Sequence, residues 1–139
     1  MTEKKVRIRI VSSMKAPDGS LHETKNARSG MLKEEADGSL SLAYEDVQDG
    51  ERAGVLLMMT EKNAKMRRQG EMTGTLNFEP GRRTPGVYAT VYGEIPVAVY
   101  TRNVRLSRME NGGELVLDYD VFVGGEKTSS AVMTITWRG

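Results

Sequence analysis

Three hydroxyl side chains spaced two residues apart are the first feature of this sequence that could do chemistry. Tyr88, Thr90 and Tyr92 stand at positions i, i+2 and i+4, and smaller apolar residues alternate with them. In a strand this spacing places all three on one face. If that face lines a barrel, the hydroxyls enter a mostly apolar cavity, which is typical of a small-molecule site. The alternative, which the sequence leaves open, is that the smaller face points inward and the tyrosines cover an outer surface.

Further tyrosines and arginines from neighbouring strands are expected to complete this site. An arginine guanidinium offers a fork of donors that fits carboxylate or phosphate groups. The predicted ligand-binding residues are Tyr88, Thr90, Tyr92, Tyr100, Arg68, Arg102 and Tyr119. They cannot all line one cavity if the registers of their strands differ.

Catalytic and redox chemistry has little support in the composition. The chain has no Cys and a single His, which excludes disulfides, cysteine nucleophiles and metal sites built from several cysteines or histidines. That residue, His22, follows a turn cluster and precedes no recognisable nucleophile motif, so we predict an exposed loop position for it. We predict no catalytic residue, no cofactor and no metal, and an enzyme is the least favoured class.

Acidic residues offer only weak metal motifs. Asp118 and Asp120 share one strand face and could share a proton or hold a cation. The opposite face of that strand is apolar, so a solvated outer face is the simpler interpretation. Asp46, Asp49 and Glu51 surround Gly50 but lack the ligand order of an EF-hand.

The net charge of +1 conceals blocks of opposite sign. Residues 1–33 hold eight basic and three acidic groups, and residues 34–51 hold seven acidic groups and no basic one. The alternative function is therefore a surface on basic strand faces that binds a polyanion, such as RNA or a phosphate-rich partner, or another protein. Nucleic acid is not the expected partner, because the pI of about 8.0 is low for such a module and the arginines are scattered. The arginines considered are Arg67, Arg68, Arg82, Arg83, Arg102, Arg105 and Arg108.

Short alternating segments separated by Gly-rich turns define the architecture. In residues 4–11, Val6, Ile8 and Ile10 alternate with charged residues, as in a half-buried strand. About ten such segments recur along the chain, which predicts one domain, residues 1–139, folded as a single antiparallel up-and-down β-barrel of eight to ten strands. Residues 31–36 and 61–69 could be helical instead, but both are too short to change the class.

Several of these segments resemble the YwiB-like family of small bacterial proteins of unknown function. The matching stretches are Arg68-Gln69-Gly70, Leu76-Asn77-Phe78 with Gly81, Tyr88 to Gly93, and Gly113 to Tyr119. The resemblance covers nearly the whole chain. It implies a closed antiparallel barrel of the calycin or lipocalin-like type from a bacterial cytoplasm, and it implies no known activity. Residues 82–86 depart from the pattern by inserting a Pro-Gly turn.

The ends of the sequence and its hydropathy bear on location and partners. No window approaches the roughly 18 apolar residues that a membrane-spanning helix requires. The N-terminal segment alternates charged and apolar residues and contains no apolar run like that of a signal peptide. We therefore predict a cytoplasmic protein, a monomer or a homodimer, with a possible small-molecule ligand and no membrane partner.

Overall fold

The computed structural model describes residues 2–48 and 50–139, and every regular element in these ranges is a β-strand. Consecutive strands are neighbours in space, so the chain runs up and down around a single sheet. The strands are β1 Thr2–Lys15, β2 Leu21–Glu34, β3 Leu40–Gln48, β4 Glu51–Met59, β5 Ala64–Gly70, β6 Thr73–Phe78, β7 Arg83–Thr90, β8 Gly93–Met109, β9 Gly112–Val123 and β10 Glu126–Arg138.

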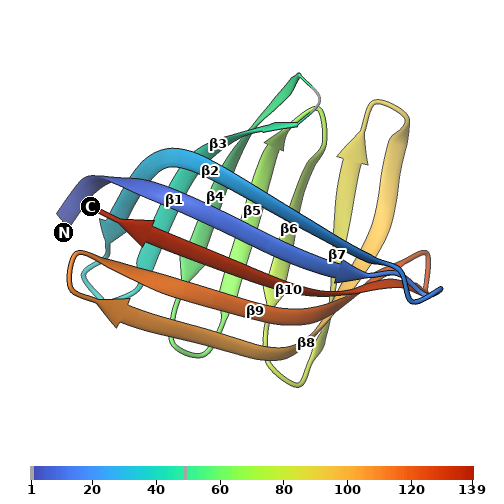
Figure 1. Ribbon diagram of the computed structural model, residues 1–139. Coiled ribbons are helices and arrows are strands. Elements are labelled where there is room, and N and C mark those ends of the chain that lie inside the picture. The colour runs from blue at the N-terminus through green and yellow to red at the C-terminus, as the bar shows by residue number, and fades with distance from the viewer. Residues whose placement is uncertain (1, 49) are drawn as a thin grey trace.

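The sheet closes into a barrel because β1 pairs with both β2 and β10 (Figure 1). All neighbouring strands are antiparallel, which confirms the predicted all-β, up-and-down barrel of eight to ten strands. The two segments for which a helix was an alternative lie in β2, in β5 and in the turns beside them. The β6–β7 pairing is the shortest in the barrel and joins Thr73 to Ala89 and Gly74 to Tyr88.

Alternation of side chains explains why these segments are strands. In β1 the side chains of Val6, Ile8 and Ile10 are buried, and the charged residues between them are exposed. The turns use residues suited to tight reversal, as between β2 and β3, where Gly38 has a φ of 89°. Period-two burial and short turns together fix which residues face the interior.

The barrel interior divides into two halves. The half that contains both ends of the chain is filled by large apolar side chains, and we call it the apolar half. Its fully buried residues include Met59, Phe78, Leu115, Ile135 and Trp137. The other half, toward the β1–β2, β3–β4, β5–β6, β7–β8 and β9–β10 turns, has charged and phenolic groups on its inner face. We call it the polar half, and its main residues are Arg28, Tyr44, Asp46, Arg68 and Tyr88.

Candidate functional site

A pocket of about 290 Å³ lies at the rim of the polar half, and we call it the rim pocket. Ala53, Arg68 and Tyr88 contribute to its wall from three different strands. Glu71 and Met72, which form the β5–β6 turn, complete one side. Glu51 and Arg52 also line the pocket, so it joins charged groups of both signs, a phenol and a short apolar surface.

Cross-strand pairing explains how the residues of the rim pocket come together. Tyr44 pairs with Val55, Val55 with Arg68, Arg68 with Gly74, and Gly74 with Tyr88. Directly paired residues point to the same face of a sheet. Since Val55 is buried in the barrel, the whole row from β3 to β7 faces the interior.

Arg28 and Arg68 both bind the carboxylate of Asp46. Arg28 Nη2 donates to Asp46 Oδ1 and Arg68 Nη1 donates to Asp46 Oδ2, each at 3.1 Å. The three side chains are largely buried, Asp46 most of all with 10% of its side chain exposed. Two guanidinium groups and one carboxylate leave one positive charge in this part of the barrel. In a partly buried site such a charge attracts an anion more strongly than it would in water.

Three tyrosine hydroxyls belong to the same region. Burial, and then the nearby charge of Asp46, raise the pKa of Tyr44 to about 12. Burial, and then the proximity of Tyr88, raise the pKa of Tyr119 to about 12. The pKa of Tyr88 is also raised by burial, an effect that the charge of Arg68 opposes. All three phenols are therefore protonated at neutral pH and can donate hydrogen bonds.

Two buried polar atoms among the described residues have no hydrogen-bond partner, Nε of Arg28 and Oγ1 of Thr101. Both residues lie on the inner face, because Arg28 pairs with buried Ile8 and Thr101 pairs with buried Tyr119. A buried polar atom without a partner costs free energy and calls for an explanation.

Thr90 and Tyr92 lie outside the barrel interior. The strand β7 ends at Thr90, and Tyr92 is 97% exposed at the tip of the following turn. Thr90 Oγ1 stabilises this turn by donating to the carbonyl of Gly93 and accepting from the amide of Tyr92. Tyr92 therefore does not share a strand face with Tyr88 and Thr90 as predicted, because the chain reverses after Thr90 and Gly93 has a φ of 117°. Both residues line a surface hollow of about 380 Å³ that adjoins the rim pocket, since Glu71 and Met72 line both.

Tyr100 and Arg102 belong to the outer surface of the barrel. Tyr100 pairs with Asp120, on the face opposite to buried Tyr119. Arg102 occupies a β-bulge, since Thr101 pairs with Tyr119 whereas Asn103 pairs with Asp118. The structure thus brings Arg68, Tyr88 and Tyr119 together and places Tyr100 and Arg102 on another surface.

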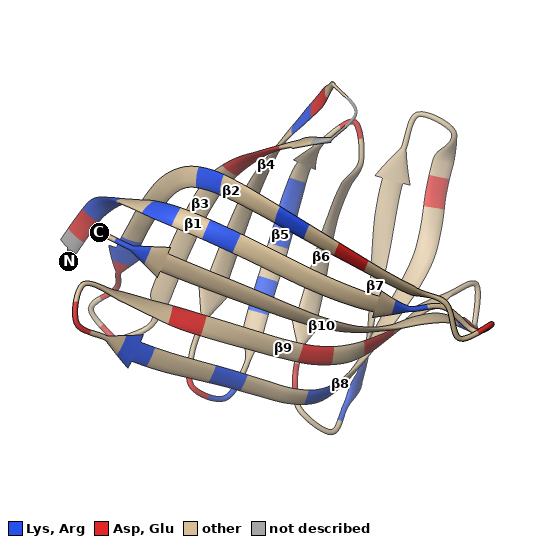
Figure 2. Ribbon diagram, in the orientation of Figure 1, with Lys and Arg blue, Asp and Glu red and all other residues tan. Residues whose placement is uncertain are grey.

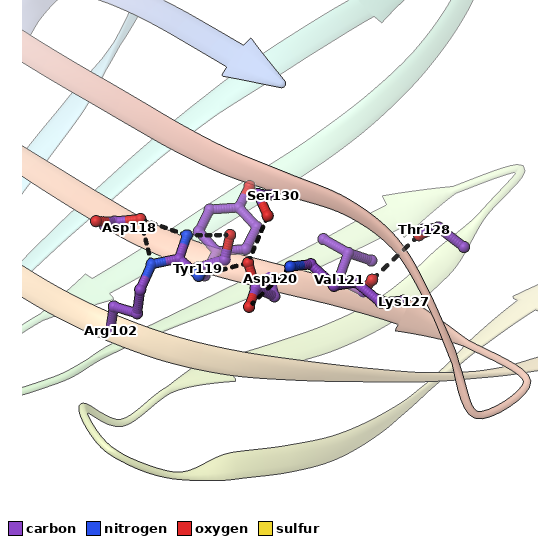
Figure 3. A network of polar contacts seen from close by, with 8 residues as sticks. All are labelled: Arg102, Asp118, Tyr119, Asp120, Val121, Lys127, Thr128 and Ser130. Carbon is purple, nitrogen blue, oxygen red and sulfur yellow. Dashed lines mark hydrogen bonds and ion pairs between the residues drawn. The ribbon is translucent and has the colours of Figure 1, made fainter. Parts of the chain in front are cut away.

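A polar network surrounds Arg102 on that outer surface (Figure 3). Arg102 donates to Asp118 from Nη2 at 2.7 Å and to Asp120 from Nη1. Ser130 also donates to Asp120, and Lys127 lies 3.7 Å from its second oxygen. Burial alone would raise the pKa of Asp120, but the hydrogen bonds from Arg102 and Ser130 and the charge of Lys127 hold it below its usual 3.8. Each charge here already has a partner, so the network is suited to stabilising the fold.

Arg28, Tyr44 and Asp46 belong to the interior site but were not predicted from the sequence as members of it. Asp46 was considered only with Asp49 and Glu51 as a weak calcium motif, and Asp49 lies outside the described residues. In the described ranges no group of three or more acidic or histidine side chains is arranged to hold a metal ion. The available signal was the period-two spacing of Arg28, Gly30 and Leu32, which places Arg28 on the inner face of β2.

A closed up-and-down barrel with an apolar half and a charged polar half defines a class of small β-barrel whose interior can be filled or can hold one small ligand. The chain belongs to the family described as a domain of unknown function, DUF1934, whose model matches residues 8–135. It is 26% identical over 98 residues to the uncharacterized beta-barrel protein YwiB of Bacillus subtilis (strain 168), covering 70% of this chain and 69% of that protein. The YwiB-like resemblance is confirmed.

A solved structure shows the same fold. The crystal structure of the ywiB protein from Bacillus subtilis superposes with a TM-score of 0.89, covering 99% of this chain and 92% of that chain, at 21% identity. Among the described residues, no helix is long and apolar enough to cross a membrane.

Proposed function

We propose that this protein binds a small anionic ligand in the polar half of its barrel, reached through the rim pocket. The observation that carries the proposal is the sharing of one carboxylate, Asp46, by Arg28 and Arg68. The remaining positive charge is partly buried and lies beside tyrosine hydroxyls that are protonated at neutral pH. An anion would supply the missing negative charge and accept these hydrogen bonds.

The size of the rim pocket limits the ligand. Its volume of about 290 Å³ lies at the lower end of the range for small-molecule sites. A carboxylate or phosphate group on a body of modest size would suit it, with the anion on Arg68 and the apolar part against Ala53 and Met72. The described residues that line the pocket include no nucleophile bonded to a general base, so we propose binding without catalysis.

The architecture supports two further parts of the proposal. Up-and-down barrels of the lipocalin-like type include ligand carriers, which supports a carrier role by analogy of fold alone. We propose that one chain holds the ligand, because the residues in question all come from a single barrel.

Native mass spectrometry of the purified protein is the direct test. A discrete extra mass that disappears on denaturation would support the proposal and give the mass of the ligand. The second test uses the anionic dye 8-anilinonaphthalene-1-sulfonate and follows its fluorescence on binding. Competition between the dye and an added carboxylate or phosphate compound then shows which class of anion binds more tightly.

Adjacent arginines on β5 provide a matched pair of variants for the dye measurement. Arg68 faces the interior, and Arg67 is exposed on the outer face. Arg68→Met should weaken dye binding tenfold or more, because a hydrogen bond to a charged group contributes about 1.5–3 kcal/mol. Arg67→Met removes the same charge and should leave binding unchanged. Equal affinities for both variants and the wild type would overturn the proposal.

A further inference from the structure

Basic side chains gather on the outer face of β1 and its two neighbours. Lys5, Arg7 and Arg9 alternate along β1, Lys25 lies on β2 and Arg138 lies on β10, and all five are exposed. We call this set the basic face. Figure 2 shows the Lys and Arg bands of β1 following one another beside the basic end of β10. Arg7, Arg9, Lys25 and Arg138 line a shallow hollow of about 710 Å³.

The pairing of Arg7 with Arg138 is unusual for a sheet. The two residues are direct cross-strand partners on β1 and β10. Like charges in this position destabilise a sheet, and opposite charges stabilise it. Within residues 2–48 and 50–139, no carboxylate forms an ion pair with either arginine. The folded barrel therefore retains an unfavourable contact between two like charges. This indicates that Arg7 and Arg138 bind a partner.

Several charged residues elsewhere on the barrel form ion pairs with residues of opposite charge. Arg52 faces Glu45, Lys33 faces Glu35 and Arg102 binds two aspartates. Among the residues that the structure describes, Lys25 is the one member of the basic face with an ion pair, an exposed contact of 3.4 Å with Glu23. Of the acidic block, Glu45 and Asp46 lie on β3, and Glu34 pairs with Thr2 at the start of β1, away from Arg7 and Arg9. The small net charge of the whole chain thus hides a strongly positive surface.

The chemistry of the basic face favours phosphate groups. Alternate residues of a strand are about 6.6–6.8 Å apart, so β1 presents cations at regular intervals along its length. Arginine binds phosphate through two parallel hydrogen bonds. Ala27 and Thr136, which also line the hollow, are small enough to let a bulky backbone approach.

The side chains of the hollow also narrow the choice of partner. The lining contains no aromatic residue on which a base could stack, so contacts with unpaired bases are disfavoured. It also lacks the exposed large apolar residues that anchor protein interfaces. The hydroxyls of Thr136 and of Ser29, the β2 partner of Arg7, can bond to the 2′-hydroxyls of RNA. We propose that the basic face binds the phosphate backbone of double-stranded RNA.

RNA belongs to the alternative function drawn from the sequence, where nucleic acid was not the expected partner because the arginines considered there are scattered. Arg67, Arg82 and Arg105 are spread over separate strands and turns, as their scattered positions suggested. The arginines of the basic face lie instead near the two ends of the chain, on β1 and β10. Only closure of the barrel brings Arg138 beside Arg7.

Fluorescence anisotropy of a labelled 20-base-pair RNA duplex tests the proposal with the full chain. Each phosphate contact contributes about 0.9 to the slope of log affinity against log salt, by the value for duplex DNA. Three to five contacts should therefore weaken binding about 40- to 500-fold between 50 and 200 mM KCl. No binding at 50 mM KCl would overturn the proposal. A DNA duplex of the same sequence should bind more weakly, and equal binding would overturn the assignment to RNA.

Two triple variants with the same net charge locate the surface. Arg7→Gln, Arg9→Gln and Arg138→Gln together should reduce RNA affinity at 50 mM KCl more than tenfold. Arg67→Gln, Arg82→Gln and Arg105→Gln together should change it less than threefold. Equal losses in the two variants would show a nonspecific charge effect and overturn the assignment. Displacement of the RNA by polyglutamate as effectively as by unlabelled RNA would assign the face to acidic proteins instead.

A single charge reversal separates binding from folding. Arg7→Glu places a carboxylate opposite Arg138, so the melting temperature should stay the same or rise while RNA binding falls tenfold or more. Retained RNA affinity in this folded variant would overturn the proposal.

Discussion

The ring of Tyr88 lies against the backbone of Gly74 in the space that a side chain at position 74 would occupy. The two residues are direct partners in the short β6–β7 pairing. Trp137 lies against Gly113 in the same way in the apolar half. In both cases a glycine on one strand lets an aromatic ring from the next strand cover it, and at Gly74 this positions the phenol of the rim pocket.

Gly74→Ala should therefore destabilise the barrel and disturb the rim pocket. The added methyl group must displace the ring of Tyr88, and overpacking of this kind costs about 1–3 kcal/mol. Urea unfolding followed by the fluorescence of Trp137 measures the loss. Gly54→Ala is the control, because Gly54 is exposed and its nearest neighbour leaves room for a methyl group. Equal stability of the two variants would contradict the role of Gly74.

Asp46→Asn should lower stability and strengthen anion binding together. The variant leaves Arg28 and Arg68 without their shared carboxylate, and removing one partner of a buried ion pair costs about 3 kcal/mol. The same change raises the positive charge of the polar half, so 8-anilinonaphthalene-1-sulfonate should bind more tightly. Chemical unfolding and dye titration measure the two effects. A loss of stability without a gain in dye affinity would mean that Asp46 has only a structural role.

The outer network predicts a dependence of stability on acid pH. The pKa of Asp120 is lower in the folded protein than its usual 3.8. Its contribution is therefore complete above pH 3.8 and is lost as the pH falls through the lower folded value. Asp120→Asn should destabilise the protein by about 1–2 kcal/mol at pH 7, and this difference should shrink below pH 4. In an Arg102→Met background, Asp120→Asn should destabilise the protein less. If the difference in unfolding free energy between Asp120→Asn and the wild type stays constant down to pH 2, the prediction is contradicted.

Buried phenols predict a loss of stability at alkaline pH. Burial raises the pKa of Tyr119 from 10.0 to about 12. The stabilisation from the neutral phenol is complete below pH 10 and is lost as the pH rises toward 12, because the unfolded chain ionises first. Tyr119→Phe should therefore flatten the fall in unfolding free energy between pH 10 and 12 by up to about 2 kcal/mol. Parallel curves for variant and wild type would show that this tyrosine is not responsible.

Local sequence pattern predicted the fold because each barrel strand carries its own alternation. Val6, Ile8 and Ile10 in β1 show which side is buried without reference to any other strand. The same reasoning placed Asp118 and Asp120 on an outer face, where the structure also has them, opposite buried Tyr119. Turn residues such as Gly38 then set where each strand ends.

The site was harder to predict because it depends on register between strands. The sequence left open which face of the Tyr88 strand points inward. The structure has Arg68, Tyr88 and Tyr119 on inner faces, whereas Tyr92 lies in a turn. Arg28 and Asp46 are 18 residues apart in the chain, and their contact follows from the alignment of β2 with β3. No local pattern contains that alignment, since it is fixed by the packing of the whole barrel.

The bulge in β8 makes one position of the barrel tolerant of a change in chain length. Thr101 pairs with Tyr119 and Asn103 with Asp118, so the register leaves Arg102 as a supernumerary residue. Deleting Arg102 would restore regular alternation and keep Val99 and Val104 inside. A deletion in the middle of another strand would instead turn half of that strand inside out, because the side-chain period is two. Descendants of this sequence can therefore lose the residue at this position and still enclose the same interior.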